Sequence, residues 1–236
     1  SIMGKTLYSL FIEGYTIKQW DIEPDQLSYE FAPKRIDLRS DGNLNLFKDT
    51  WEYFHPGGSG EIIEKILLDA EVEKSIYIDI ENVNEIFKDF DAIVITAPLD
   101  IFINSSKKLD WRGIKMESKF IQTANESDTI TEAYQINHPS LNEPFTRTIE
   151  TKHASGQLVN GSVVSEEYSY ENIRHYPILT KDGTSKKLNE SLKKEIKNNI
   201  KIPTYFCGRL ANYQYINQDE AILQGFNSST EIIKDI

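Results

Sequence analysis

The sequence contains little of what several protein classes require. Cys207 is the single cysteine among 236 residues, so neither an internal disulfide nor a cysteine-based zinc site can form, and we expect a reducing, cytoplasmic location. The four histidines are scattered along the chain and give no support to a histidine metal site. No apolar run approaches the roughly 20 residues of a membrane-spanning helix. The first residues carry no signal-peptide pattern, and without a start methionine they are compatible with a piece of a longer protein.

Positive charge is also scarce. The chain has 26 Lys and Arg against 37 Asp and Glu, a formal net charge of −11. A surface of this sign repels phosphate backbones, so we expect no nucleic-acid partner. Neither a P-loop nor a Gly-x-Gly-x-x-Gly fingerprint is present. The turn Gly57-Gly-Ser-Gly60 could cradle a phosphate before a helix, but without the P-loop lysine a glycine-rich turn that caps the helix is the better explanation.

The hydrophobic pattern predicts an α+β fold. We expect a helical segment at the start, a central, mostly antiparallel, twisted sheet, and a terminal strand–turn–helix. Helices are predicted at 5–20, 61–70, 184–199 and 218–227, and strands at 76–80, 92–98, 145–150, 161–169 and 203–208, with further strand segments in 112–136. Residues 21–34, with two prolines, are predicted as loop or short helix. Ser59 is the expected N-cap of the second helix, and Ile222 and Phe226 are expected to face inward.

Several arginines and aromatics have the chemistry of a phosphate or nucleotide site. The arginines sit beside aromatic or turn residues, at Arg35, Arg112, Arg147 and Arg209. A guanidinium makes bidentate contacts to phosphate oxygens. The aromatics that could stack on a base or donate a hydroxyl are Tyr15, Trp20, Tyr176, Tyr213 and Tyr215. Each residue also has an ordinary structural explanation, as a solvated surface arginine or a core aromatic.

Nine short segments, taken together in order, resemble UDP-galactopyranose mutases. The first is Gly14-Tyr-Thr-Ile-Lys-Gln-Trp20, which looks like that family's Gly-Tyr-Thr-x-Lys-Gln-Trp motif. The others are Lys34–Arg39, Phe47–Trp51, Ile95–Asp100, Leu109–Arg112, Pro144–Arg147, Glu167–Ser169, Tyr176-Pro177 and Phe206–Tyr215. The resemblance covers nearly the whole chain but only the later part of the family's length, and the family's dinucleotide-binding start is not in it.

The resemblance implies a flavoenzyme, an isomerase of polysaccharide biosynthesis. Such an enzyme interconverts UDP-galactopyranose and UDP-galactofuranose through an adduct at N5 of reduced FAD, and this chain would supply mainly the nucleotide-sugar site. Two alternatives stay open: a mutase for a dTDP- or GDP-linked sugar, and a non-catalytic nucleotide-sugar-binding protein. The expected partners are the nucleotide sugar and either a second copy of the chain, as a homodimer, or an FAD-binding segment.

The resemblance also implies which residues bind. The substrate-binding residues would be Phe11, Tyr15, Thr16, Trp20, Arg35, Arg112, Asn137, Arg147, Tyr176 and Tyr215. Arg209 would lie near the flavin, and no catalytic side chain is assigned because the chemistry belongs to the cofactor. The implied organisation is a helical and mobile-loop segment at 1–75, a sheet-based substrate domain at 76–200, and a return into the FAD domain at 201–236.

The sequence departs from the family pattern at sites that bear on specificity. Leu46 (or Asn45) stands where the family has a loop tyrosine that stacks on uracil, and such stacking is worth roughly 1–3 kcal/mol. Asn217 replaces an aspartate after the Tyr-x-Tyr motif, and His175 replaces the first tyrosine of a Tyr-Tyr-Pro segment. The sequence therefore leaves open whether the preferred nucleotide is UDP, dTDP or GDP.

Overall fold

The chain forms two compact units, each built from more than one stretch of sequence. The structure, a computed structural model, describes residues 4–31, 42, 53–171 and 173–236. Unit 1 comprises Ser1–Pro24, Ala32–Lys74 and Lys115–Ser169, and unit 2 comprises Asp25–Phe31, Ser75–Ile114 and Tyr170–Ile236. The α+β class is confirmed. The three-part division at residues 75 and 200 stays a prediction.

Unit 1 begins with a helical stretch, as predicted for residues 5–20. It consists of α1 (Gly4–Tyr8), the π-helical turn η1 (Ser9–Glu13) and α2 (Gly14–Trp20). Asp21 ends the stretch in the left-handed conformation, with φ 55°, and its amide donates to the Ile17 carbonyl at 2.7 Å. A second helix, α3 (Gly58–Ile66), also belongs to this unit.

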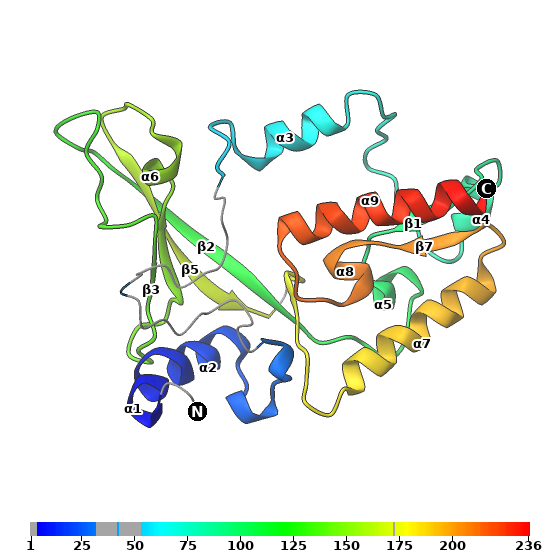
Figure 1. The fold of residues 1–236 in the computed structure, drawn as a ribbon, viewed down its shortest axis with the longest axis horizontal. Helices are drawn as coiled ribbons and strands as arrows, with labels where there is room; N and C mark the ends of the chain where they lie inside the picture. The colour runs from blue at the N-terminus through cyan, green and yellow to red at the C-terminus, as the bar shows by residue number, and fades with distance from the viewer. Residues whose placement is uncertain (1–3, 32–41, 43–52, 172) are drawn as a thin grey trace. The chain divides into compact units, whose positions relative to one another are not determined.

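Antiparallel strands form the rest of unit 1 (Figure 1). They belong to a five-stranded sheet of order β3-β4-β5-β2-β6. Its members are β2 (Trp111–Ile121), β3 (Gln135–Asn137), β4 (Arg147–Glu150), β5 (Ser162–Tyr170) and β6 (Tyr176–Pro177), with the short helix α6 (Lys152–Ser155) after β4. The pairs β3–β4, β4–β5 and β2–β6 are antiparallel, as the sequence predicted. The first residues of β2, together with β6, fall in unit 2.

Unit 2 is built around a second, parallel pair of strands that the sequence did not predict as a pair. β1 (Ile93–Ile95) runs parallel to β7 (Thr204–Phe206), with Val94 opposite Tyr205. In Figure 1, the long helices α7 (Thr184–Asn199) and α9 (Gln218–Asp235) lie on either side of this strand pair. The remaining elements are η2 (Pro24–Gln26), η3 (Tyr29–Phe31), α4 (Val83–Ile86), α5 (Leu99–Phe102) and α8 (Gly208–Asn212).

The buried hydrophobic cluster lies wholly in unit 2. Helix α7 contributes Leu192 and Ile196, which are spaced one helical turn apart, as predicted. The other members are Val83, Ile93, Ile95, Leu99, Phe102, Leu109, Trp111, Leu179, Ile200, Ala211 and Tyr213. In unit 1, by contrast, Trp20 is the only large apolar side chain buried among the described residues, and the other buried side chains are polar. Unit 1 therefore depends more heavily on hydrogen bonds.

The strand predicted at 76–80 is absent, and side-chain hydrogen bonds explain why. The Asp79 amide donates to Asn82 Oδ1 at 3.0 Å, and the Glu81 amide donates to Asp79 Oδ1 at 2.9 Å. Asn82 Nδ2 in turn donates to the Tyr77 carbonyl at 3.0 Å. Asp and Asn side chains that bond to nearby backbone compete in this way with a strand ladder. The isoleucine alternation was a correct pattern with the wrong interpretation.

Two helix predictions also need correction. Helix α3 begins at Gly58 with Gly57 as its N-cap, so Ser59 lies inside the first turn and is not the cap. Helix α9 begins as predicted, behind a capping box of Asn217 and Glu220, but it continues to Asp235. Its residues Ile222 and Phe226 are 47% and 68% exposed, so they do not face inward. The apolar stripe was read as a core face because the sequence alone does not show what covers a helix.

Candidate functional site

Helix α2 is fixed to the loop between β3 and β4 by two residues of the Gly14–Trp20 motif. Lys18 Nζ donates to three backbone carbonyls of that loop: His138, Glu143 at 3.1 Å and Phe145 at 2.8 Å. Gly14 lies so close to it that a Cβ atom would stand 2.3 Å from the Pro139 carbonyl oxygen. Burial lowers the pKa of Lys18, and the charge of Glu143 opposes that change. Gly14 and Lys18 are therefore structural residues, a role that sequence reasoning missed.

This attachment holds Tyr15 against the sheet. Arg147 Nη2 donates to the Tyr15 hydroxyl at 2.6 Å, and Arg147 Nε lies 3.3 Å from Glu167 Oε1. In the sheet register, Arg147 stands opposite Asn137 on one side and opposite Glu167 on the other. Three polar residues, from α2, β3 and β5, thus lie around the Arg147 side chain of β4. The structure brings together three of the residues predicted to bind substrate: Tyr15, Asn137 and Arg147.

Glu167 is the part of this group that the prediction omitted. Its side chain is buried, and burial raises the pKa of its carboxyl, while the charge of Arg147 and a hydrogen bond from Thr146 act in the opposite direction. The charge of Arg147 therefore favours the ionised form of Glu167 against the effect of burial. The pairing of Glu167 with Arg147 could have been predicted only from the register of β4 and β5, because the two residues are 20 positions apart in the chain.

The remaining predicted residues of unit 1 have different surroundings. Phe11 is 58% exposed on η1, and Thr16 is half-buried on α2. Trp20 is buried at the end of α2, next to Gln19, whose carbonyl accepts a hydrogen bond from the Ser169 hydroxyl at 3.0 Å. Arg35 and Leu46 lie outside the described residues.

A second group of predicted residues gathers in unit 2, where an arginine lies against two tyrosine rings. Arg209 Cζ is 4.7 Å from the ring centroid of Tyr176 and 5.7 Å from that of Tyr215. The two rings are 5.4 Å apart and tilted by 49°. Cation–π contacts of this geometry are favourable by about 0.5–2 kcal/mol. We call Arg209, Tyr176 and Tyr215 the tyrosine–arginine cluster.

Backbone carbonyls fix the guanidinium of this cluster. Arg209 Nε donates to the Ile216 carbonyl at 3.0 Å, Nη2 donates to the same oxygen, and Nη1 donates to the His175 carbonyl at 3.1 Å. Three of the five guanidinium N–H groups are used in this way, so the partly exposed side chain retains donors for an external acceptor. Tyr215 is 41% exposed. The cluster is rigid, cationic and accessible, which is what recognition of an anion requires.

Arg112 lies beside the cluster on β2. In the β2–β6 register it stands opposite Tyr176, and its Nη1 is 3.9 Å from Glu171 Oε1. The Arg112 side chain is largely buried. Arg112 thus belongs to the same unit and the same strand pair as Tyr176, and a shared role in binding stays a prediction.

Tyr213, which was considered as a stacking residue, is a core residue instead. It is fully buried, and its hydroxyl donates to the carbonyls of Asp110 at 2.6 Å and Ile178 at 2.9 Å. Its ring meets Trp111 edge-on, with centroids 5.0 Å apart. Burial raises the pKa of its hydroxyl. Tyr213 therefore links the residues next to β2 and β6 from the buried core of unit 2.

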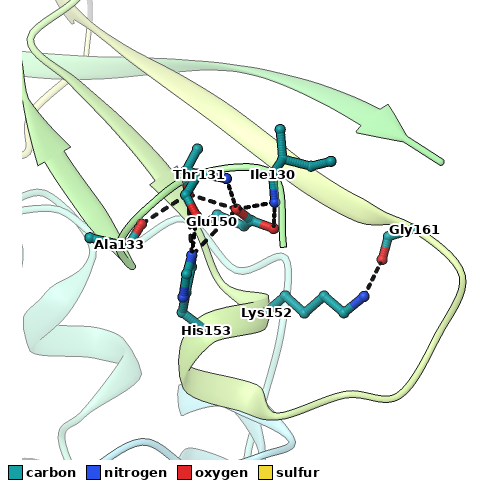
Figure 2. Close-up of polar contacts among 7 residues, drawn as sticks. All are labelled: Ile130, Thr131, Ala133, Glu150, Lys152, His153 and Gly161. Carbon is teal, nitrogen blue, oxygen red and sulfur yellow. Dashed lines mark hydrogen bonds and ion pairs between the residues drawn. The ribbon is translucent and has the colours of Figure 1, made fainter. Parts of the chain in front are cut away.

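Unit 1 contains a further buried carboxylate, Glu150 (Figure 2). Both of its oxygens accept from the Ile130 amide at 3.0 Å, and Oε2 accepts from the Thr131 amide at 2.7 Å and hydroxyl at 2.6 Å. His153 Nε2 lies 3.5 Å from the same oxygen. Burial opposes ionisation, but hydrogen bonds from Ser162, Thr131 and Ile130 outweigh it and lower the pKa of Glu150 to about 2. Glu150 anchors the segment that leads into β3.

Neither a metal centre nor a membrane span emerges from the part of the chain that the structure describes. No cluster of three or more His, Cys, Asp or Glu residues there could hold a metal ion. None of the described helices combines the length and apolar character needed to cross a bilayer. The groups around Arg147 and Arg209 each combine a guanidinium with at least one tyrosine side chain.

Comparison with known proteins identifies the family. The family model for UDP-galactopyranose mutase matches residues 10–215. This chain belongs to the UDP-galactopyranose mutase family. The enzymes of that family are isomerases and generally depend on FAD. The matched range contains every residue predicted to bind substrate or flavin, whereas helix α9 lies beyond it.

Individual relatives agree with this family assignment. A probable UDP-galactopyranose mutase of Klebsiella pneumoniae is 29% identical over 241 residues, covering 99% of this chain and 59% of the relative. A dTDP-fucopyranose mutase of Escherichia coli is 24% identical over 245 residues, covering 99% and 62%. The crystal structure of a reduced UDP-galactopyranose mutase shares the fold, with a TM-score of 0.73 and 15% identity over 99% of this chain and 65% of that one. The chain thus spans about three-fifths of the length of its curated relatives.

Proposed function

We propose that this chain binds a nucleotide sugar through its diphosphate and acts in the interconversion of UDP-galactopyranose and UDP-galactofuranose. The observation that carries the proposal is the tyrosine–arginine cluster in a chain of the UDP-galactopyranose mutase family. A guanidinium held in place with donors to spare, beside two phenol groups, matches the acceptors of a diphosphate. In unit 1, Tyr15 and Arg147 form another pairing of a hydroxyl with a guanidinium, and the resemblance implies that these two residues bind substrate as well.

The work of this chain in such a reaction is positioning. Arginine and tyrosine side chains would hold the diphosphate in the substrate and again when it is the leaving group, so that the nucleotide stays bound while the sugar ring changes size. Arg209 has two N–H groups left after its bonds to the Ile216 and His175 carbonyls, so it can serve both the diphosphate and the flavin contact that the resemblance implies. When bound, a reduced flavin supplies the electron pair that displaces the diphosphate from the anomeric carbon.

The base that the site accepts is a separate proposal. A dTDP-linked sugar is the second candidate, because one relative is a dTDP-fucopyranose mutase and because Leu46 replaces the uracil-stacking tyrosine. A GDP-linked sugar has weaker support, and a protein that binds without catalysis is the third alternative. A cytoplasmic location also remains a prediction, as does self-association or contact with an FAD-binding segment. Exposed apolar residues on α9 support such a contact.

Calorimetric titration of the chain with UDP, dTDP and GDP tests this proposal. We expect micromolar binding of UDP or dTDP, and weaker binding by the Tyr215→Phe variant. Tyr205→Phe is the matched control, because it removes a hydroxyl of the same unit that is bonded instead to Asp235 at 2.7 Å. Absence of binding to all three nucleotides would refute the proposal. The flavin absorbance of the purified chain, before and after incubation with FAD, separates a mutase from a non-catalytic binding protein.

A further inference from the structure

The side chain of His175 lies next to the tyrosine–arginine cluster without being part of it. His175 directly precedes Tyr176, and its Nδ1 accepts a hydrogen bond from the Ile114 amide of β2 at 2.8 Å. The His175 amide donates to the Arg112 carbonyl at 3.3 Å, and the His175 carbonyl accepts from Arg209 Nη1 at 3.1 Å. His175 is therefore tied to β2 on one side and to the arginine of the cluster on the other.

The backbone of β2 is shaped to admit this bond. At Gly113 a Cβ atom would stand 2.5 Å from the Ile173 carbonyl oxygen and 2.9 Å from that of Tyr170. Tyr170 and Ile173 thus lie directly against the β2 backbone at Gly113. The regular β2–β6 pairing ends at Arg112 and Tyr176, and the imidazole takes the Ile114 amide beyond that point. The imidazole of His175 therefore takes the place of a strand partner for the Ile114 amide.

We propose that His175 is the positioning residue of the tyrosine–arginine cluster, holding Tyr176 and Arg209 in place through the Ile114–Nδ1 hydrogen bond. The inference rests on the proposed function in so far as the cluster binds a nucleotide diphosphate. His175 acts through the backbone and touches no reacting atom. Only a side chain with an acceptor at the Nδ1 position can accept the Ile114 hydrogen bond. The function of the imidazole is therefore to accept this bond and not to transfer a proton.

Protonation of His175 removes this acceptor. Burial lowers the pKa of His175, and the positive charge of Arg209 lowers it further, so the ring is neutral at pH 7. The other charged groups nearby are already paired: Arg112 with Glu171 at 3.9 Å, and Arg174 with Asp100 at 3.3 Å. Acidification below the usual histidine range therefore places a proton on Nδ1, breaks the bond to Ile114 and sets two cations side by side.

Two variants distinguish the effect of the hydrogen-bond acceptor from the effect of the imidazole ring itself. In His175→Asn, the amide oxygen can occupy the place of Nδ1 and does not titrate, whereas His175→Leu keeps similar bulk without an acceptor. His55→Leu is the matched control, because His55 Nδ1 accepts from a backbone amide in the same way, that of Gly57 at 3.1 Å, in the other unit. All three are prepared in the full chain.

The first readout is nuclear magnetic resonance of the free protein, with labelled tyrosine rings. We expect His175→Leu to shift the ring resonances of Tyr176 and Tyr215, while His175→Asn and His55→Leu leave them near the wild-type positions. Unchanged rings in His175→Leu would overturn the inference. Equal shifts in His175→Asn and His175→Leu would overturn it too, because the acceptor would then not be the reason. This readout needs no ligand, so it stands even if the proposed function fails.

The second readout is binding. We expect His175→Leu to weaken UDP binding by about 2- to 10-fold, the factor for one lost hydrogen bond at an exposed position, and His175→Asn by less than about 2-fold. With UDP-galactose, which lacks the terminal phosphate that titrates near pH 6, wild-type affinity should fall only on acidification below the usual histidine range, and the affinity of His175→Asn should not change with pH. Tighter wild-type binding at acid pH would contradict the positioning role. Failure of the wild type to bind any nucleotide at neutral pH would count against the proposed function instead.

Discussion

Replacing Lys18 by methionine should detach helix α2 from the β3–β4 loop while keeping the length of the side chain. Lys18 donates to the carbonyls of His138, Glu143 and Phe145. A charge-assisted hydrogen bond contributes about 1.5–3 kcal/mol, but the three share one ammonium and burial of that charge offsets part of the gain. We therefore expect a loss of about 3 kcal/mol in the free energy of opening of this loop, with little effect on unit 2.

Hydrogen–deuterium exchange of peptides covering residues 138–146 is the appropriate assay, since the His138 amide is bonded to the Thr146 carbonyl at 2.9 Å. A loss of about 3 kcal/mol corresponds to roughly 100-fold faster exchange. The exposed Lys5, on α1 of the same unit, provides the control Lys5→Met. Equal protection in Lys18→Met and Lys5→Met would refute the assignment of Lys18 as the attachment point.

A glycine pair tests the same attachment from the other side. Alanine normally stabilises a helix by about 1 kcal/mol relative to glycine. At Gly14 the added Cβ would collide with the Pro139 carbonyl oxygen, whereas at Gly225 on α9 it would meet nothing within 4 Å. We expect Gly14→Ala to accelerate exchange at 138–146 and Gly225→Ala to be neutral or stabilising. Stabilisation by Gly14→Ala would contradict the close approach.

Three further predictions concern the interior and the site. Tyr213→Phe should lower the free energy of unfolding of unit 2 by about 1–3 kcal/mol, because the carbonyls of Asp110 and Ile178 lose a buried donor. Denaturant melts followed by tryptophan fluorescence would show this, and an unchanged midpoint would contradict it. Glu150, whose pKa is lowered from about 4.5 to about 2, should stabilise unit 1 fully above about pH 4.5 and progressively less as the pH falls toward 2. Unfolding of wild type and Glu150→Gln should therefore differ by about 1–2 kcal/mol at pH 7, after allowance for solvent screening, and converge in acid; a gap that widens in acid would be inconsistent with it. Arg147→Ala should weaken UDP binding by about 1.5–3 kcal/mol in calorimetry, and wild-type affinity would remove Arg147 from the site.

The parts of the fold that the sequence predicted are those decided by local pattern. Helix α7 was predicted correctly because its apolar residues recur with helical spacing along one face of an otherwise polar helix. The 76–80 segment was missed because Asp79 and Asn82 satisfy the backbone locally, which overrides a strand alternation. The parallel partnership of β1 and β7 was missed because it joins segments more than 100 residues apart.

The candidate site divides in the same way. Family resemblance pointed to Tyr176, Tyr215 and Arg209, and the structure brings these three side chains together. That they bind a diphosphate stays a prediction. Lys18 was quoted as part of a motif without a role, because its three acceptors lie 120 to 127 positions further along the chain and a single sequence does not show that contact. His175 was interpreted as a mere substitute for tyrosine because its acceptor role depends on the end of the β2–β6 pairing.

The most direct test of the central claim is to map the binding surface by titrating the isotopically labelled chain with UDP and following its resonances. The account predicts that the largest shifts fall on Arg209, Tyr176 and Tyr215, and on Tyr15 and Arg147, while the pocket between α7 and α9 that is lined by Lys193, Lys197 and Phe206 stays unchanged. Saturable shifts confined to that lysine-lined pocket, or no shifts at millimolar UDP, would contradict it.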